Sequence, residues 1–578
     1  MSKAKTLFLA LLLPLSLSLN LATGQTASPL VRYDTSYDIV SPVRAQHGMV
    51  ASEQALATQV GLDILKRGGN AVDAGVAVGF ALAVVLPNAG NLGGGGFMLI
   101  HDAKSGKDVA LDFREMAPAA ASRDMYLDAA GQVIPERSLY THLAVGVPGT
   151  VAGLALALEK YGSMPLKDVI APAIKLAQQG FEVSPTLAAK LAAERGHMER
   201  WPSTRAIFFK DGRPLQAGAI LRQTDLARSL RLIAAQGKSA FYQGEIGKKI
   251  VAEMARHQGS ITAADLSNYR VVERTPVSGT YRGYQVLSMP PPSSGGVHIV
   301  QMLNMLEHYP VRDYGSNSAQ NLHLLSEIMK LAYADRSEYL GDPDFSKVPL
   351  QGLTARAYAA ELVRQIDPER ATPSAAIKPG QPQAYESDQT THYSVADKYG
   401  NVVSTTYTLN MNFGSGIVAG GTGIVLNNEM DDFSAKPGVP NAFGLIGGEA
   451  NAIRAYKRPL SSMSPTIVLK DGKPFLVTGS PGGSRIISTT LQTIVNVIDH
   501  GMNVAEATIT PRIHQQWMPD QLRVEKGISP DTLRLLAQKG QQLAPSATLG
   551  RTQTIQMDAG GFYGYSDPRN PDGKALGY

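Results

Sequence analysis

Thr390 stands where the chain could create a nucleophile. It follows a proline-rich polar stretch, 366–389, and begins a segment with the alternating pattern of a β-strand. A threonine hydroxyl is a weak nucleophile unless a base takes its proton, and no histidine is suitably placed to do so. Cleavage between Gln389 and Thr390 would free an α-amine, which titrates near ~8 and is therefore basic enough. These residues favour acyl transfer or hydrolysis by an N-terminal nucleophile.

A predicted hairpin positions this threonine. The alternating segments 391–396 and 402–408 flank a turn at 397–401. If the turn centres near Tyr399, Thr390 lies opposite Thr408, which brings the two hydroxyls together. His392 points to the other face of the strand, and we expect it to have a structural role.

A second hairpin leads into a candidate anion site. Strands at 466–469 and 474–478 flank Asp471-Gly472, and the segment Gly479-Ser480-Pro481-Gly482-Gly483 follows them. A helix is expected from 484 to about 499. The Gly482 and Gly483 N–H groups at its start, together with the helix dipole, favour a negative charge there.

Helices and strands alternate through the first part of the chain. The pattern predicts a helix capped by Ser52 with Leu56, Val60 and Ile64 on one face. Asn70 precedes a second helix, 71–86, whose Ala, Gly and Val content predicts burial on all sides. Strands are expected at 97–100 and 109–113, and the proline-rich stretch 366–389 is expected to be a flexible linker.

Composition narrows the classes of function. The chain has 578 residues, no cysteine, 44% apolar and 18% charged residues, and a formal charge of +5. Thiolate catalysis and thiolate metal sites are excluded, and no basic cluster with interleaved aromatics predicts nucleic-acid binding. The glycine pattern at 414–419 lies outside a βαβ unit, and no zinc-binding helix motif occurs. We expect neither a metal nor an organic cofactor.

The N-terminus predicts export. Lys3 and Lys5 precede an apolar run, 7–21, and small residues follow at Ala22 and Gly24. This pattern is typical of a signal peptide spanning residues 1–24. The alternative is a membrane anchor, but the run is shorter than the ~20 residues that a membrane span needs. We expect a periplasmic or secreted protein without a stable membrane anchor.

Five motifs, in order along the chain, resemble those of the bacterial γ-glutamyltranspeptidases. They occupy residues 112–118, 289–296, 389–395, 459–466 and 479–485. The resemblance implies the four-layer αββα sandwich of N-terminal-nucleophile hydrolases, an α+β fold. It also implies a precursor cut into a large subunit, 25–389, and a small subunit, 390–578, which share one core.

The resemblance also implies roles for individual residues. Thr390 is the nucleophile, Thr408 its helper, and Gly482 and Gly483 the oxyanion donors. The remaining matches bind the substrate's α-carboxylate or α-ammonium group: Arg114, Asn410, Glu429, Asp432, Ser461 and Ser462. Phe443 lies in a lid loop, 437–448, where many bacterial members have a tyrosine, so the lid is expected to close by packing alone and to open more readily.

The function implied is that of a γ-glutamyltranspeptidase acting on glutathione and related compounds, with water or an amino acid or peptide as the acceptor. Two alternatives remain at this point. One is an amide acylase of the same fold with a different acyl pocket. The other is an exported binding protein without enzymatic activity. Arg114 and Asp432 favour the γ-glutamyltranspeptidase over the acylase, because an acyl group without a zwitterion would leave both residues unpaired.

Overall fold

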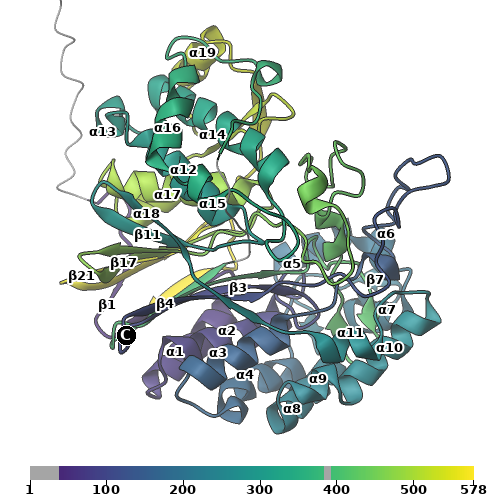
Figure 1. Ribbon diagram of the computed structural model, residues 1–578. Helices are drawn as coiled ribbons and strands as arrows, with labels where there is room; N and C mark the ends of the chain where they lie inside the picture. Colours follow the sequence, from purple (N-terminus) through teal and green to yellow (C-terminus); the bar gives the residue numbers. More distant parts are fainter. Residues whose placement is uncertain (1–37, 383–391) are drawn as a thin grey trace, which may run out of the picture.

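Two seven-stranded antiparallel sheets lie face to face at the centre of the molecule (Figure 1). The computed structural model describes residues 38–382 and 392–578. The first sheet has the order β1 (Val43–Ala45), β22 (Gly561–Ser566), β21 (Gln553–Asp558), β17 (Lys473–Thr478), β16 (Thr466–Lys470), β11 (Tyr284–Ser288), β10 (Val277–Tyr281). The second has the order β23 (Lys574–Gly577), β2 (Gly48–Ser52), β12 (Tyr393–Asp397), β13 (Val402–Thr408), β3 (Gly95–Asp102), β4 (Lys107–Phe113), β9 (Val272–Arg274).

Strand β3 shows why both faces of the second sheet are buried. Phe97 and Leu99 enter the core between the sheets, where they join Leu287 and Ile467 of the first sheet. The alternate residues, Met98 and Ile100, belong to the core beneath the helices. Side chains of successive strand residues point to opposite faces, so a continuously apolar strand needs a cover on both sides.

A helical layer covers the outer face of each sheet (Figure 1). The second sheet is covered by α1 (Ala55–Lys66), α2 (Ala71–Val85), α3 (Thr150–Tyr161), α4 (Leu166–Gln179), α8 (Thr224–Gln236) and α10 (Glu245–Arg256). The first sheet is covered by α12 (Gly295–Leu306), α14 (Ala319–Tyr339), α16 (Arg356–Leu362), α17 (Arg485–Ile498), α18 (Val504–Ile509) and α19 (Pro530–Gln538). The αββα sandwich is therefore confirmed.

Helix α2 is buried along its whole length, as its composition predicts. Asn70 caps it, because the Asn70 side chain accepts from the backbone N–H groups of Val72 and Asp73. Small residues let the helix approach the sheet closely: a Cβ on Gly79 would lie 2.9 Å from the Tyr393 hydroxyl. The helix thus packs directly under the hairpin that was predicted to carry the nucleophile.

The first helix departs from the prediction at its start. Ser52 is the last residue of β2, and the cap of α1 is Gln54, whose Oε1 accepts from the Leu56 backbone N–H at 2.6 Å. Leu56 is exposed, so the buried face begins with Ala57 and Val60 instead. The strand β2 is needed between β23 and β12, which shifts the helix start toward the C-terminus.

The predicted hairpin has the expected register over its described residues. Tyr393 pairs with Thr405 and Ser394 with Ser404, which is the alignment obtained by centring the turn near Tyr399. Gln389 and Thr390 lie outside the described residues, as do residues 1–24. The second hairpin, β16 and β17, also forms as predicted, with Asp471 and Gly472 in its turn.

The described part of the expected linker, 366–382, makes specific contacts. The Thr372 and Gly380 backbone N–H groups donate to Glu327 and Asp335 of α14, at 2.9 and 2.8 Å. Ser374 and Ile377 are buried. Proline-rich composition indicates irregular structure, but it does not reveal whether acidic side chains elsewhere are ready to hold the segment. No helix in the described ranges is both long and apolar enough to cross a membrane.

Candidate functional site

Arg114 follows β4 directly, and its guanidinium group is completely buried. One terminal nitrogen donates to the Glu429 carboxylate, and the other donates to Asp432 Oδ2 at 2.6 Å. Nε donates to the Pro459 carbonyl at 3.3 Å. Burial opposes the charge, but attraction to Glu429 and Asp432 outweighs it, so the pKa of Arg114 is raised. The group is a permanent buried cation.

Two buried glutamates surround this cation. Glu115 Oε2 lies 3.8 Å from an Arg114 terminal nitrogen, and neither Glu115 oxygen has a hydrogen-bond partner among the described residues. Burial raises the pKa of Glu115 to about 7, and it raises the pKa of Glu429 well above its ordinary value despite the attraction of Arg114. The protonation of both glutamates is therefore set by burial against the charge of Arg114.

The loop 409–428, which includes the short paired strands β14 (Val418–Ala419) and β15 (Ile424–Val425), links Thr408 to the carboxylate turn η4 (Glu429–Asp432). The backbone N–H of Asn410 donates to Thr408 Oγ1 at 2.8 Å, and the Asn410 side chain donates to the Asn428 carbonyl at 2.9 Å. Asn410 has φ 75°, a left-handed conformation that asparagine tolerates better than most residues. The Asn451 side chain holds the Asp432 carbonyl at 2.7 Å. The loop therefore brings Thr408, Asn410, Glu429 and Asp432 into one region.

Ser461 and Ser462 are positioned by α14 and by the motif at 289–296. The Ser461 backbone N–H donates to the Pro292 carbonyl at 3.1 Å, and Ser294 Oγ donates to the Ser461 carbonyl at 3.0 Å. Arg336, a buried residue of α14, donates to Ser462 Oγ at 3.1 Å and to Ser294 Oγ at 2.9 Å. Burial lowers the pKa of Arg336 to about 10. The motifs do not include Arg336, although an arginine inside a largely buried helix is a signal in itself.

Gly482 and Gly483 form a turn just before α17, with φ of 138° and 58°. Within residues 38–382 and 392–578, neither backbone N–H has a hydrogen-bond acceptor. The Phe443 ring packs on this turn, since a Cβ on Gly483 would lie 2.6 Å from its Cδ1. The Phe443 carbonyl accepts from the Gln516 side chain at 3.4 Å. With these two N–H groups available and the Phe443 ring packed over them, the turn is a candidate anion-binding site.

Comparison with known proteins identifies the family. The family model described as gamma-glutamyltranspeptidase matches residues 57–577. The chain belongs to the γ-glutamyltranspeptidase family. It is 59% identical over 559 residues to the glutathione hydrolase proenzyme of Escherichia coli K12, covering 96% of each chain.

Solved structures agree with this assignment. Cephalosporin acylase from Bacillus halodurans matches with a TM-score of 0.83 and 31% identity, covering 94% of this chain and 99% of that one. γ-Glutamyltranspeptidase from Helicobacter pylori matches with a TM-score of 0.56 and 44% identity, covering 60% of this chain and 97% of that one. Membership of the γ-glutamyltranspeptidase family and the N-terminal-nucleophile fold are thus confirmed.

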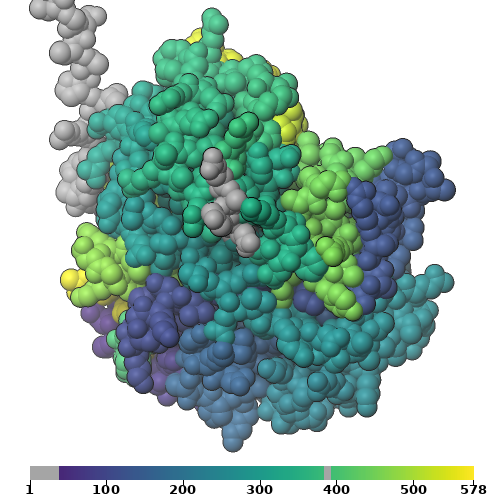
Figure 2. Space-filling view, viewed as in Figure 1, coloured from purple at the N-terminus to yellow at the C-terminus, as the bar shows by residue number. Residues whose placement is uncertain are grey.

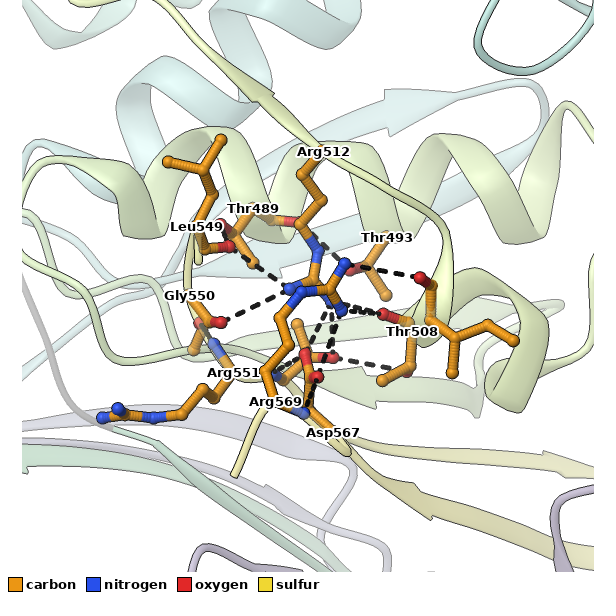
Figure 3. A network of polar contacts seen from close by, with 12 residues as sticks. Thr489, Thr493, Thr508, Arg512, Leu549, Gly550, Arg551, Asp567 and Arg569 are labelled. Carbon is orange, nitrogen blue, oxygen red and sulfur yellow. Dashed lines mark hydrogen bonds and ion pairs between the residues drawn. The ribbon is translucent and has the colours of Figure 1, made fainter. Parts of the chain in front are cut away.

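A polar network around Arg512, Asp567 and Arg569 holds the segment 549–550 (Figure 3), which lies beside the glycine turn of this family member. Gly550 lies beside the turn: a Cβ on Gly550 would be only 2.5 Å from Ser480 Oγ. Arg512, which is fully buried, donates to the Leu549 carbonyl at 3.2 Å and to Asp567 Oδ2 at 2.8 Å. The ion pair between Arg512 and Asp567 therefore holds the 549–550 segment in place. This segment in turn packs closely against Ser480.

Helix α14 contacts both the glycine turn and the serine pair Ser461-Ser462. The Tyr333 hydroxyl donates a hydrogen bond to the Ser484 carbonyl beside the glycine turn. One helical turn further along, Arg336 donates to Ser462 Oγ. The segment around 120–140 packs against the 430–450 region, and Figure 2 shows the two side by side in dark blue and light green. There Lys436 Nζ donates to the Gly131 carbonyl at 2.9 Å.

His392 is buried between Ser394 and Gly479. Its Nε2 lies 2.7 Å from Ser394 Oγ, and a Cβ on Gly479 would be 2.5 Å from the ring. Burial lowers the pKa of His392 to about 3, so the ring is neutral at physiological pH. These contacts fit the structural role expected for it.

Proposed function

We propose that this protein is a γ-glutamyltranspeptidase that also hydrolyses glutathione. The observation that carries the proposal is the charge pattern around Arg114. A buried cation donates to the backbone carbonyls of Pro459 and Leu460, which directly precede Ser461 and Ser462, and to the carboxylates of Glu429 and Asp432. A γ-glutamyl group carries an α-carboxylate and an α-ammonium, and this site offers a partner to each.

In this proposal the chain is a precursor with a signal peptide at 1–24. Cleavage between Gln389 and Thr390 gives a large subunit, 25–389, and a small subunit, 390–578. The Thr390 hydroxyl attacks the Gln389 carbonyl, an N-to-O shift forms an ester, and water hydrolyses it. The E. coli relative is named a proenzyme, which supports processing of this kind. Export to the periplasm or beyond follows from the same signal peptide.

The mature enzyme uses the same hydroxyl on its substrate. The Thr390 α-amine takes the hydroxyl proton as the oxygen attacks the γ-amide carbon, and Thr408 positions the nucleophile. The negative oxygen of the tetrahedral intermediate is bound by the Gly482 and Gly483 N–H groups. The intermediate collapses to an ester as the leaving amine takes the proton. Water or an acceptor amine then attacks the ester and regenerates Thr390.

Substrate binding is divided among the other residues. Arg114, Ser461 and Ser462 bind the α-carboxylate, while Asn410, Glu429 and Asp432 bind the α-ammonium. Phe443 covers the reacting centre through its contact with Gly483. An acylase of the same fold is the second candidate, supported by the likeness to the B. halodurans cephalosporin acylase. An acyl group without a zwitterion would leave Arg114 bound only to the protein's own carboxylates.

Two measurements test the proposal. A denaturing gel of the purified wild type should show two bands, while Thr390→Ala should show one uncut chain and Thr391→Ala should still be cut. The processed enzyme should then release nitroaniline from a γ-glutamyl anilide. A single uncut wild-type band contradicts the N-terminal-nucleophile mechanism. Two bands without anilide turnover, but with hydrolysis of a cephalosporin side chain, favour the acylase.

A further inference from the structure

Two histidines and a glutamate converge at a point outside the site described above. His142 begins the short helix η1 (His142–Ala144), whereas Glu253 and His257 lie on and just after α10. His142 Nε2 is 3.3 Å from Glu253 Oε1, and His257 Nε2 is 3.4 Å from the same oxygen. All three potential ligand atoms lie within 4.8 Å of one another.

These spacings match a coordination sphere. A tetrahedral Zn²⁺ with ligands at ~2.0–2.1 Å has neighbouring ligand atoms about 3.3 Å apart. Two edges of the His142, Glu253 and His257 triangle already have this length. The two imidazole rings lie 4.6 Å apart, and the edge-on ring of Trp201 packs 4.8 Å from His142 and 5.4 Å from His257. The ligands are therefore held together before any ion arrives.

The second carboxylate oxygen is held separately. Glu253 Oε2 accepts from the Gly420 backbone N–H at 3.4 Å and from Arg256 at 3.3 Å. Oε1 is thereby left to face the histidines as a single ligand atom. Arg256 is 65% exposed, so its charge is largely screened by solvent. Contacts that orient a ligating carboxylate from outside are a regular part of metal sites.

We propose that His142, Glu253 and His257 bind one divalent transition-metal ion, with Zn²⁺ as the preferred ion. Two imidazoles and one carboxylate suit Zn²⁺ and its neighbours in the first transition series, and they disfavour Mg²⁺ and Ca²⁺. His257 is partly exposed, which leaves the fourth position open to water. The sequence pattern predicted no metal, because the ligands come from two distant segments rather than from one motif.

The ion would join two parts of the fold. His142 belongs to the segment that contacts η4, where Ser138 Oγ donates to Asp431 at 2.7 Å and Asn428 donates to the Leu139 carbonyl at 3.1 Å. Binding would fasten this segment to α10 and so stabilise the wall behind the carboxylate turn. The site is thus a structural clamp, which does not depend on the proposed reaction.

Calorimetric titration of the untagged protein with ZnCl₂ tests the clamp. We expect one saturable Zn²⁺ per wild-type chain. His257→Ala should weaken binding at least ~100-fold, since even changes around a metal's ligands cost 10–100-fold. Glu253→Gln should also weaken binding. His308→Ala removes an exposed histidine after α12 and should leave the titration unchanged. Replacement by Co²⁺ should give the intense visible absorption of a tetrahedral site in the wild type alone.

Two results of the titration would contradict the proposed metal site. The absence of a saturable site in the wild type overturns the proposal, and so does equal affinity in wild type and His257→Ala. Circular dichroism of the metal-free variants verifies that they are folded, and the exposed position of His257 makes misfolding of that variant unexpected. Anilide turnover of metal-free His257→Ala should equal that of metal-free wild type, whatever the outcome of the titration.

Discussion

At the scale of single residues, the proposed binding mode requires Arg114 to exchange partners when a substrate binds. Without a ligand, the two terminal nitrogens of Arg114 donate to the carboxylates of Glu429 and Asp432. An incoming α-carboxylate brings its own negative charge, while the α-ammonium attracts the displaced carboxylates. The protein's ion pairs are therefore replaced by ion pairs with the substrate, so the buried charge stays balanced.

Glu115 gives this balance a pH dependence. Its pKa is raised to about 7 in the folded protein from an ordinary value of 4.5, first because of burial. Between these two values the folded state holds a proton that the unfolded state has released, so stability falls as the pH rises through this window. Glu115→Gln removes this loss. The variant should gain stability relative to wild type between pH 5 and pH 8, on the order of 1–3 kcal/mol.

Thermal unfolding of both proteins across this pH range measures the effect. Glu182→Gln, at an exposed position, is the matched control and should show a constant difference from wild type. A Glu115→Gln difference that is equally flat from pH 5 to pH 8 would mean that Glu115 is ionised throughout.

Phe443 is expected to make the lid looser than a tyrosine would. Its ring packs on Gly483, but it carries no hydroxyl to fasten the loop. Phe443→Tyr should lower the KM for the γ-glutamyl donor up to ~5-fold, the equivalent of one hydrogen bond of about 1 kcal/mol. The ratio of transfer to hydrolysis should change with it. Steady-state rates with and without a dipeptide acceptor measure both quantities, and identical values would rule out this role of the ring.

Motifs made most of the site predictable, but only where a residue's role is visible in its own segment. Hairpin register predicts that Thr408 lies opposite Thr390, which is outside the described residues, and the position before a helix predicted the Gly482-Gly483 turn. Arg336 was not predictable, because its importance arises from contacts with Ser294 and Ser462, which lie in other segments. The partnership of Glu115 with Arg114 is likewise a product of burial, which the sequence does not specify.

At the scale of elements, the glycine turn depends on the 549–550 segment. Gly550 has φ 80°, and a Cβ there would lie 2.5 Å from Ser480 Oγ and 2.7 Å from Thr489 Oγ1. Gly550→Ala should therefore displace Ser480 and the turn that follows it. We expect kcat/KM for the anilide to fall at least ~10-fold, because misplacing one oxyanion donor can cost 10²–10³ in rate.

Gly540→Ala separates backbone strain from the clash. Gly540 has φ 90°, yet its Cβ would meet only Ala371 Cβ, at 3.8 Å. Both variants pay about 1–2 kcal/mol for a left-handed alanine. Gly540→Ala should lower the melting temperature but keep kcat/KM close to wild type. Equal loss of activity in both variants would show that general destabilisation, rather than the turn, is responsible.

Elements with strong local patterns were the predictable ones. Helix α2, both hairpins and α17 follow directly from capping residues, composition and turn residues. The start of α1 was wrong because sheet pairing of Ser52 overrides its capping preference. The contacts of residues 366–382 depend on acidic residues of α14, so no inspection of the segment alone could have found them.

At the scale of the whole molecule, strands from before residue 383 and after residue 391 are interleaved. In the second sheet, β12 and β13 lie between β2 and β3, and in the first sheet β22 pairs with β1. The two proposed subunits should therefore stay together after cleavage. They should co-elute in size-exclusion chromatography and unfold in one thermal transition. Separate elution in the absence of denaturant would contradict a shared core.

The position of β12 and β13 also has a consequence for biosynthesis. A polypeptide ending before them would lack the two central strands of the second sheet, and β2 and β3 would each present an unpaired edge to other chains. Such edges promote aggregation. A gene divided at codon 390 would therefore yield halves that are poor starting points for assembly, whereas a single translated chain forms the sheet first and is cut afterwards.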